Sequence, residues 1–144
     1  MTLEVIVFVG LQGAGKSTYY RERLARTHAL VSKDLLRNHR RPAERQLALI
    51  DEALAAGRKV VVDNTNLTRA SRAGVIEVAR RRGARVVAYV FLAPLERCLE
   101  RNARREGRAR VPEFVVRNAA RSIEPPTLDE GFDEIVAVED EERE

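Results

Sequence analysis

An eight-residue segment near the start of the chain constrains the fold more than any other feature. Residues 10–17 read GLQGAGKS and match the pattern G-x-x-x-x-G-K-[ST]. The segment follows a β-branched apolar run at 3–9, which is typical of a strand buried on both faces of a parallel sheet, and it precedes a helical pattern over 16–26. In this context glycines let the backbone wrap closely around phosphate groups. The segment therefore predicts a binding site for a nucleoside triphosphate.

This loop also predicts roles for individual residues. We expect Lys16 to reach the β- and γ-phosphates and the Ser17 hydroxyl to bind Mg²⁺, so that ATP and Mg²⁺ are the expected ligands. The expected nucleotide site comprises Gly10, Gln12, Gly13, Ala14, Gly15, Lys16, Ser17 and Thr18.

Strand and helix patterns alternate along the rest of the 144-residue chain. Apolar runs at 29–31, 60–63, 86–92 and 135–138 predict four more strands, and helical patterns cover 34–40, 42–56, 68–82, 94–106 and 112–122. Such alternation favours right-handed βαβ units. We therefore predict a three-layer α/β fold with a central, mostly parallel five-stranded sheet flanked by helices. We expect one domain over residues 1–138 and an acidic tail at 139–144.

Two carboxylates follow predicted strands, where ligands of parallel sheets bind. Asp34 could accept a proton from an acceptor hydroxyl, and Arg37, three residues later on a short helix, could hold a neighbouring phosphate. The helix dipole alone also favours an acid in a first turn, so a structural role for Asp34 stays open. Asp63 ends its strand where a carboxylate commonly reaches Mg²⁺ directly or through water, although an Asx turn would also explain it.

Arginine dominates the charge of the chain, with 23 arginines and three lysines. The last six residues hold five acids and one arginine and contribute −4 to a total of +4, so residues 1–138 carry +8. This balance favours polyanionic partners such as nucleic acid, although solvated faces also need charge. Six arginines gather at 97–110, where they could form a lid that stabilises charge in phosphoryl transfer or only a solvated face.

Other features exclude whole classes of site. The single cysteine, Cys98, cannot form an internal disulfide or a cysteine-based zinc cluster, and two histidines do not suggest a His-rich metal site. The longest apolar run is far shorter than a bilayer span, and the N-terminus carries no leader pattern. We therefore expect a cytoplasmic protein with no membrane contact.

Several segments together resemble the kinase domain of 5′-hydroxyl polynucleotide kinases, the end-healing type of phages and animals. The loop at 10–18 is shared with many kinases, whereas SKDLLR at 32–37, DNTN at 63–66 and EPPTLDEGF at 124–132 are more specific matches. The resemblance covers nearly the whole chain. It implies a P-loop kinase fold with an Arg-rich lid at about 101–112, and transfer of the γ-phosphoryl group of ATP to the 5′-hydroxyl end of DNA or RNA.

The same resemblance implies residue roles. It makes Asp34 the general base and Arg37 a contact for the substrate phosphate, with Arg105 acting on the phosphoryl group beside Lys16 and Arg101 on the nucleotide. The acceptor site would further contain Asp63, Asn64, Thr65, Asn66 and Arg72. Known members of this family carry a phosphatase or ligase domain beside the kinase. A separate protein could supply the trimming of nucleic acid ends here.

Two other functions remain open from the sequence. A P-loop kinase of a small hydroxylated metabolite or antibiotic would share this size and loop, but a neutral acceptor would not need Arg37 and an arginine-lined approach. A non-catalytic nucleotide-dependent switch or nucleic-acid-binding module would have no need of a general base at Asp34.

Overall fold

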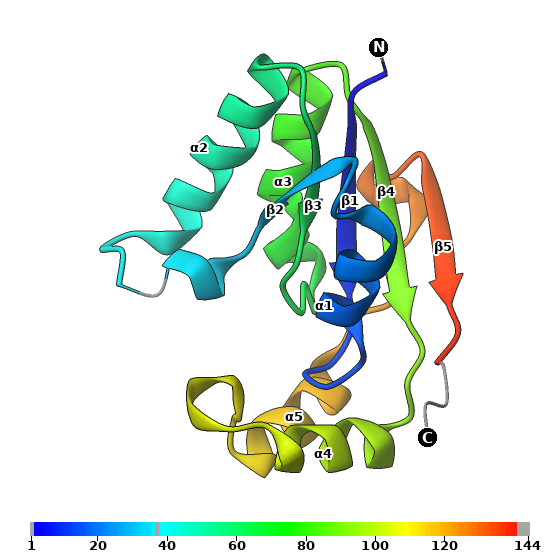
Figure 1. Cartoon of the computed structure of the whole chain (residues 1–144). Coiled ribbons are helices and arrows are strands. Elements are labelled where there is room, and N and C mark those ends of the chain that lie inside the picture. Colours follow the sequence, from blue (N-terminus) through cyan, green and yellow to red (C-terminus); the bar gives the residue numbers. More distant parts are fainter. Residues whose placement is uncertain (1, 37, 141–144) are drawn as a thin grey trace.

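Five parallel strands form one sheet in the computed structural model, which describes residues 2–36 and 38–140 (Figure 1). The strands are β1 (Glu4–Val9), β2 (His28–Val31), β3 (Lys59–Val62), β4 (Arg85–Phe91) and β5 (Glu134–Val138). They lie in the order β2-β3-β1-β4-β5, and every neighbouring pair is parallel. The predicted α/β fold is confirmed, and the sheet is wholly rather than mostly parallel.

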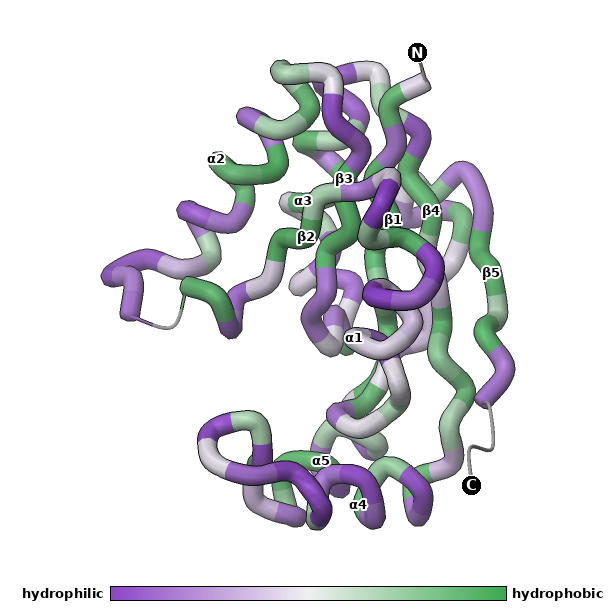
Figure 2. The backbone as a smooth tube through the Cα atoms, viewed as in Figure 1, coloured by the Kyte–Doolittle hydropathy of each residue, from purple (hydrophilic) through white to green (hydrophobic). Residues whose placement is uncertain are grey.

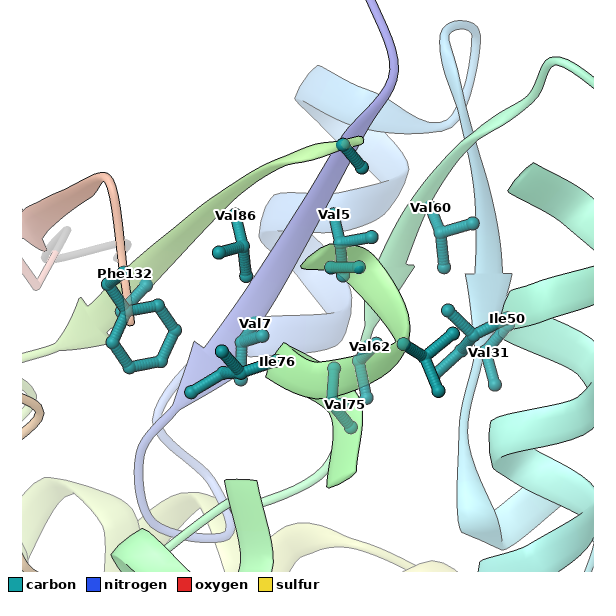
Figure 3. Packing of buried hydrophobic residues seen from close by; sticks show 14 of the residues in the cluster. Val5, Val7, Val31, Ile50, Val60, Val62, Val75, Ile76, Val86 and Phe132 are labelled. Carbon is teal, nitrogen blue, oxygen red and sulfur yellow. The ribbon is translucent and has the colours of Figure 1, made fainter. Parts of the chain in front are cut away.

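Helices cover both faces of this sheet. The α-helices are α1 (Lys16–Tyr19), α2 (Pro42–Ala55), α3 (Arg69–Arg81), α4 (Leu95–Arg104) and α5 (Glu113–Ser122). Successive side chains of a strand point to opposite faces. Val5 and Val7 of β1 accordingly pack with α2 and α3 in one core cluster (Figure 3), whereas Ile6 and Phe8 pack in a second cluster with α1, α4 and α5. The result is three layers with apolar strands in the middle (Figure 2).

The first helix is shorter than the predicted 16–26. α1 ends at Tyr19 and continues as a π-helical turn, Tyr20–Leu24, in which the Ala25 amide donates to the Tyr20 carbonyl at 2.9 Å. The wider turn allows two consecutive tyrosines to be used in packing. The Tyr19 ring meets Phe8 edge to face, and the Tyr20 hydroxyl donates to the His28 carbonyl at 2.7 Å.

The helix predicted at 34–40 is instead a 3-10 helix, η2 (Lys33–Leu36). Ser32 organises this turn, because its carbonyl accepts from the Leu35 amide at 3.2 Å and its hydroxyl accepts from the Asp34 amide at 3.2 Å. Arg37, the predicted contact for a substrate phosphate, lies outside the described residues.

The remaining predicted elements match the structure to within a few residues. Thr68 caps α3 as predicted, since its hydroxyl accepts from the Ser71 amide at 3.1 Å. α4 stops at Arg104, two residues before the predicted end, and a 3-10 turn, η3 (Gly107–Ala109), connects it to α5. Along the described part of the chain, no helix combines the length and the apolar character needed to cross a membrane.

Candidate active site

The loop between β1 and α1 lies at the carboxyl edge of the sheet, close to α4 (Figure 1). Gly13 and Gly15 have φ angles of +82° and +94°, which glycine adopts without strain. A Cβ at Gly13 would lie 2.5 Å from the carbonyl oxygen of Cys98 in α4, so only glycine fits there. The loop conformation is therefore fixed by backbone geometry and by contact with α4.

This loop has the features required of a phosphate cradle. Among the described residues, the amides of Gly13 and Gly15 have no backbone acceptor, and the buried Oε1 of Gln12 has no hydrogen-bond partner. Beside Gly15 the nearest atom that a Cβ would meet is Nη1 of Arg101, at 4.0 Å. Gly10 has a different role, because its amide donates to the Thr65 carbonyl at 3.1 Å and so ties the loop to the end of β3.

Lys16 is a buried cation at the start of α1, with 9% of its surface exposed. Its Nζ donates to the carbonyl oxygens of Gly10 at 2.7 Å and Asn64 at 3.3 Å. Burial lowers the pKa of its ammonium group to about 8; the Asp63 carboxylate acts against this shift, and Arg105 adds to it. A buried ammonium that is only partly compensated favours a bound anion.

Ser17 and Asp63 form the pair of oxygen ligands predicted for Mg²⁺. The Ser17 hydroxyl donates to Oδ2 of Asp63 at 2.9 Å. Ligands at right angles around Mg²⁺, with bonds of 2.0–2.1 Å, are also about 2.9 Å apart, so this spacing fits the ion. Burial raises the pKa of the Asp63 carboxyl, whereas Lys16 and the Ser17 hydrogen bond lower it. No group of three or more metal-ligating side chains occurs in the described residues, which fits an ion completed by phosphates and water.

Asp34 and Arg105 reach this centre from opposite elements, η2 and the end of α4. Both charges act on Lys16 and on Asp63, since Asp34 raises and Arg105 lowers the pKa of each. The predicted catalytic residues are therefore close enough for their charges to interact. Asp34 is exposed and borders a cavity of about 480 Å³, which Arg108 and His39 also line.

A second cavity, of about 310 Å³, lies against the loop. The predicted nucleotide-site residues that line it are Gly13, Ala14, Gly15, Thr18 and Arg101, and Arg105, predicted to act on the transferring phosphoryl group, lines it as well. Arg101 spans its wall, with Nη1 donating to the Gly13 carbonyl at 3.1 Å and Nη2 to Oδ1 of Asp140 at 2.8 Å. Arg101 therefore borders the cavity that lies against the loop, whereas Asp34 borders the other cavity, whose described lining contains no residue of the loop.

Asp140, the second residue of the predicted acidic tail, is paired in the structure. Its carboxylate bridges Arg101 and Arg97, the latter at 3.1 Å, and only 12% of its side chain is exposed. Two guanidinium groups within hydrogen-bond distance explain this burial of an acidic residue. The end of β5 is thereby attached to α4, and residues 141–144 lie outside the described part.

Arg72 also requires a correction, because the structure gives it a structural position. The side chain is fully buried, and its Nε and Nη2 donate to both carboxylate oxygens of Glu130 at 2.9 and 3.0 Å. Nη1 donates to the carbonyls of Asn66 and Glu124 at 2.8 and 3.0 Å. Four of the five N–H groups of this guanidinium donate to protein acceptors, and the side chain has no exposed surface for a direct contact with a substrate. It holds the loop after β3 in place.

The two asparagines of the predicted acceptor segment also stabilise loops. Asn66 is buried at φ +48°, and its Nδ2 donates to the Phe8 carbonyl at 2.7 Å. Asn64 accepts from the Lys33 amide at 2.9 Å and donates to Oε1 of Gln46 at 2.6 Å. Because of these bonds, Asn64 connects the end of β3 with the turn that carries Asp34.

Comparison with known proteins gives a family. A family model described as an AAA domain, AAA_33, matches residues 5–126. The chain belongs to this family. Solved structures show that the AAA domain has the fold of P-loop kinases. A fungal RNA kinase is 16% identical and superposes with a TM-score of 0.69. The match covers 100% of this chain and 78% of the RNA kinase chain. A sugar kinase from Janibacter sp. HTCC2649 is 19% identical, also with a TM-score of 0.69. The match covers 96% of this chain and 86% of the sugar kinase chain.

A provisionally assigned kinase from Chloroflexus aurantiacus has a TM-score of 0.74 at 14% identity, over 96% of this chain and 85% of that one. At such identities the likeness establishes the fold alone. The AAA domain therefore has the fold of P-loop kinases, and its ligands have to be argued from the site itself.

Some residues important for the geometry of this AAA domain were missed from the sequence. Asn102, which is buried in α4, closes the base of the Arg-rich segment because it donates to the Val111 carbonyl at 2.7 Å and accepts from the Val111 amide at 3.0 Å. Gln46, the partner of Asn64, was also missed. A polar residue at a core-facing position of a helical pattern is the signal that both share.

Proposed function

We propose that this AAA domain is an ATP-dependent polynucleotide kinase that transfers the γ-phosphoryl group of ATP to the 5′-hydroxyl end of DNA or RNA. The observation that carries the proposal is the position of Asp34. This exposed carboxylate lies at the carboxyl end of β2, its charge acts on Lys16 and Asp63, and it borders a cavity lined by Arg108. An acceptor in that cavity would place its hydroxyl between a base and the phosphate cradle.

Each of the site residues has a distinct role in the proposed reaction. Lys16 and the amides of the loop hold the triphosphate in the cavity lined by Arg101. Ser17 and Asp63 would hold Mg²⁺, which when bound neutralises charge on the phosphates. Asp34 takes the proton of the 5′-hydroxyl as its oxygen bonds to the γ-phosphorus, and the bond from this phosphorus to the leaving oxygen of ADP breaks. Arg105 stabilises the charge that develops on the transferring group.

The charge of the acceptor side supports a polyanionic acceptor over a neutral one. Lys33 in η2 and Arg40, four residues after η2, are exposed, and Arg108, from the segment after α4, lines the cavity that Asp34 borders. A neutral sugar acceptor would gain little from these cations, whereas the first phosphates of a nucleic acid end would be attracted to them. The predicted contact of Arg37 with that phosphate belongs to the same proposal.

Transfer of labelled γ-phosphate from ATP to 5′-hydroxyl oligonucleotides, DNA and RNA in parallel, tests the proposal. Lys16→Ala should abolish transfer, and Asp34→Ala should lower kcat by roughly 10² to 10⁴ with nearly unchanged ATP binding. Asp51→Ala is the matched control, because it removes a half-buried carboxylate on α2 that pairs with Arg82, the residue after α3. Absence of transfer to either oligonucleotide while ATP still binds would contradict the proposal and favour a small hydroxylated acceptor.

A further inference from the structure

The outer face of α5 combines an exposed aromatic ring with arginines. Phe114 is 64% exposed, whereas the three other phenylalanines of the chain are at most 7% exposed. Arg117, Asn118 and Arg121 are exposed as well, and they follow Phe114 at i+3, i+4 and i+7, so the four side chains share one face of the helix. We call these four residues the α5 stripe.

The opposite face of α5 explains why Phe114 is not a core residue. Val116 and Ala119 are buried in the cluster that joins α5 to α4 and the sheet. Because these positions already attach the helix, the ring of Phe114 adds nothing to that packing. An exposed aromatic side chain that does not serve the core is available for a ligand.

The charge around the α5 stripe selects the chemistry of that ligand. Residues 101–121 contain seven arginines and two glutamates, a net charge of +5. Within the described residues, Arg121 has no ion pair, and Arg117 pairs only with Glu113 at 3.5 Å in an exposed contact. Exposed pairs of this kind contribute little, so Arg117 can exchange Glu113 for a phosphate at small cost. A polyanion is the complementary partner.

The stripe is also continuous with the acceptor side of the site. Arg108 lines the cavity that Asp34 borders, Arg110 follows it as an exposed residue, and α5 begins three residues later. Figure 1 shows this segment on the side of α4 and α5 that faces η2. Arg108 and Arg110 therefore lie in the segment that connects the acceptor cavity with the α5 stripe.

We propose that the α5 stripe binds the nucleotides of a single-stranded nucleic acid that follow its 5′ end. The inference rests on the proposed function for the location of that end at Asp34. Base–aromatic stacking with guanidinium contacts to the backbone is the usual chemistry of single-strand binding. A single strand fits better than a duplex, because Phe114 needs a base face that no neighbouring base covers.

Binding and kinetics on acceptors of two lengths test the inference, with a labelled dinucleotide and a labelled strand of about a dozen nucleotides, both with 5′-hydroxyl ends. Phe114→Leu keeps an apolar side chain but removes the stacking ring. We expect it to weaken binding of the longer strand, measured by fluorescence anisotropy, by roughly fivefold or more. Its KM for that strand should rise equally, while kcat and the KM of the dinucleotide stay unchanged. Phe114→Trp should restore the affinity.

A double variant, Arg117→Gln with Arg121→Gln, tests the phosphate contacts. The slope of log affinity against log salt should decrease by about 0.7 for each arginine that contacts a phosphate. Arg58→Gln is the matched control, since Arg58 is exposed before β3 at the opposite end of the sheet. Unchanged binding of the longer strand by the stripe variants, or an equal loss for both acceptors, would overturn the inference.

These outcomes are separable from a failure of the proposed function. If the wild-type protein phosphorylates both acceptors but Phe114→Leu changes neither KM, the inference is wrong and the kinase function stands. If the longer strand binds in a manner that depends on Phe114 but no 5′-hydroxyl end is phosphorylated, the stripe is supported and the kinase function is wrong.

Discussion

The two sides of the site are stabilised in different ways. On the side of the loop and β3, Lys16, Asn66 and Arg72 are buried and hydrogen-bonded to the backbone. On the side of α4 and α5, Arg104, Arg108 and Arg110 are exposed, and none of the three has an ion pair among the described residues. The first side is preorganised by the fold, whereas the second contributes charge with little involvement in the core.

This difference separates stability from activity. A residue that is buried and bonded in the first side cannot be removed without a cost to the folded state. An exposed arginine of the second side that has no described ion pair can be replaced at nearly constant stability, because its neighbours do not depend on it. Variants of the first side should therefore lose stability in unfolding assays, whereas variants of the second side should lose activity in transfer assays.

The largest effect is expected at Arg105, on the exposed side. Arg105→Ala should lower kcat by about 10³, because a well-placed arginine stabilises charge in the transition state of phosphoryl transfer. The one described hydrogen bond of its side chain, to the Ala109 carbonyl at 3.4 Å, is weak, so Tm should change by only about a degree. Single-turnover transfer and thermal unfolding measure the two quantities. Arg104→Ala is the control, and an equal loss there would show that only the net charge of the segment matters.

Arg72 provides the contrasting case on the buried side. Arg72→Met removes one partner of a fully buried ion pair and leaves the Glu130 carboxylate without its cation, which should lower the free energy of unfolding by about 3 kcal/mol. The folded fraction should keep a kcat near that of the wild type at low temperature. Urea unfolding with activity assays checks both statements. Full stability with lost activity would indicate a substrate contact instead.

Arg72 also shows where prediction from the sequence stops. The phosphate-binding loop, the strands and the cap at Thr68 could be predicted because each depends on neighbours within a few residues. The surroundings of Arg72 depend on Glu130 and Glu124, which are more than 50 positions away. An arginine in a polar motif has the same sequence signature whether it faces a phosphate or a buried carboxylate.

The same limit applies to Asp140. In the sequence it belongs to a run of acids, and its pairing with Arg97 and Arg101 arises only because β5 ends beside α4. The sequence correctly placed Asp34, Asp63 and the loop at one edge of the sheet, because the direction of parallel strands dictates that arrangement. The sequence does not predict which arginine pairs with which acid in the tertiary structure, because a third of the residues are charged and many pairs are possible.

A smaller effect is expected from the titration of Lys16 on the buried side. Its pKa is lowered to about 8, so the ammonium is charged below this pH and loses its proton above it. Bound phosphates raise the pKa, so ADP affinity measured without metal should be constant below about pH 8. Above this pH it should fall by up to tenfold per unit until the pKa of the complex is reached. Calorimetry in buffers of different ionisation heat should detect proton uptake.

Lys16→Arg is the control for this titration, because a guanidinium group keeps its charge over the whole range. Its affinity is expected to be lower and independent of pH between about 7 and 10. The Cys98 thiol is buried, and this burial raises its pKa above the ordinary value. A flat profile for the wild-type protein would mean that Lys16 does not contact the phosphates.

The smallest effect is expected at Asp140, where the two sides of the site meet. Asp140→Asn removes a negative charge from the wall of the nucleotide cavity, where this carboxylate pairs with Arg101. ATP should bind about threefold more tightly, because a partly exposed charge pair is worth only a few tenths of a kcal/mol to 1 kcal/mol. Glu139→Gln is the matched control, since Glu139 lines the same cavity without a described ion pair. An equal gain in both variants would assign the effect to net charge, whereas weaker binding in Asp140→Asn alone would mean that this carboxylate holds Arg101 in its binding position.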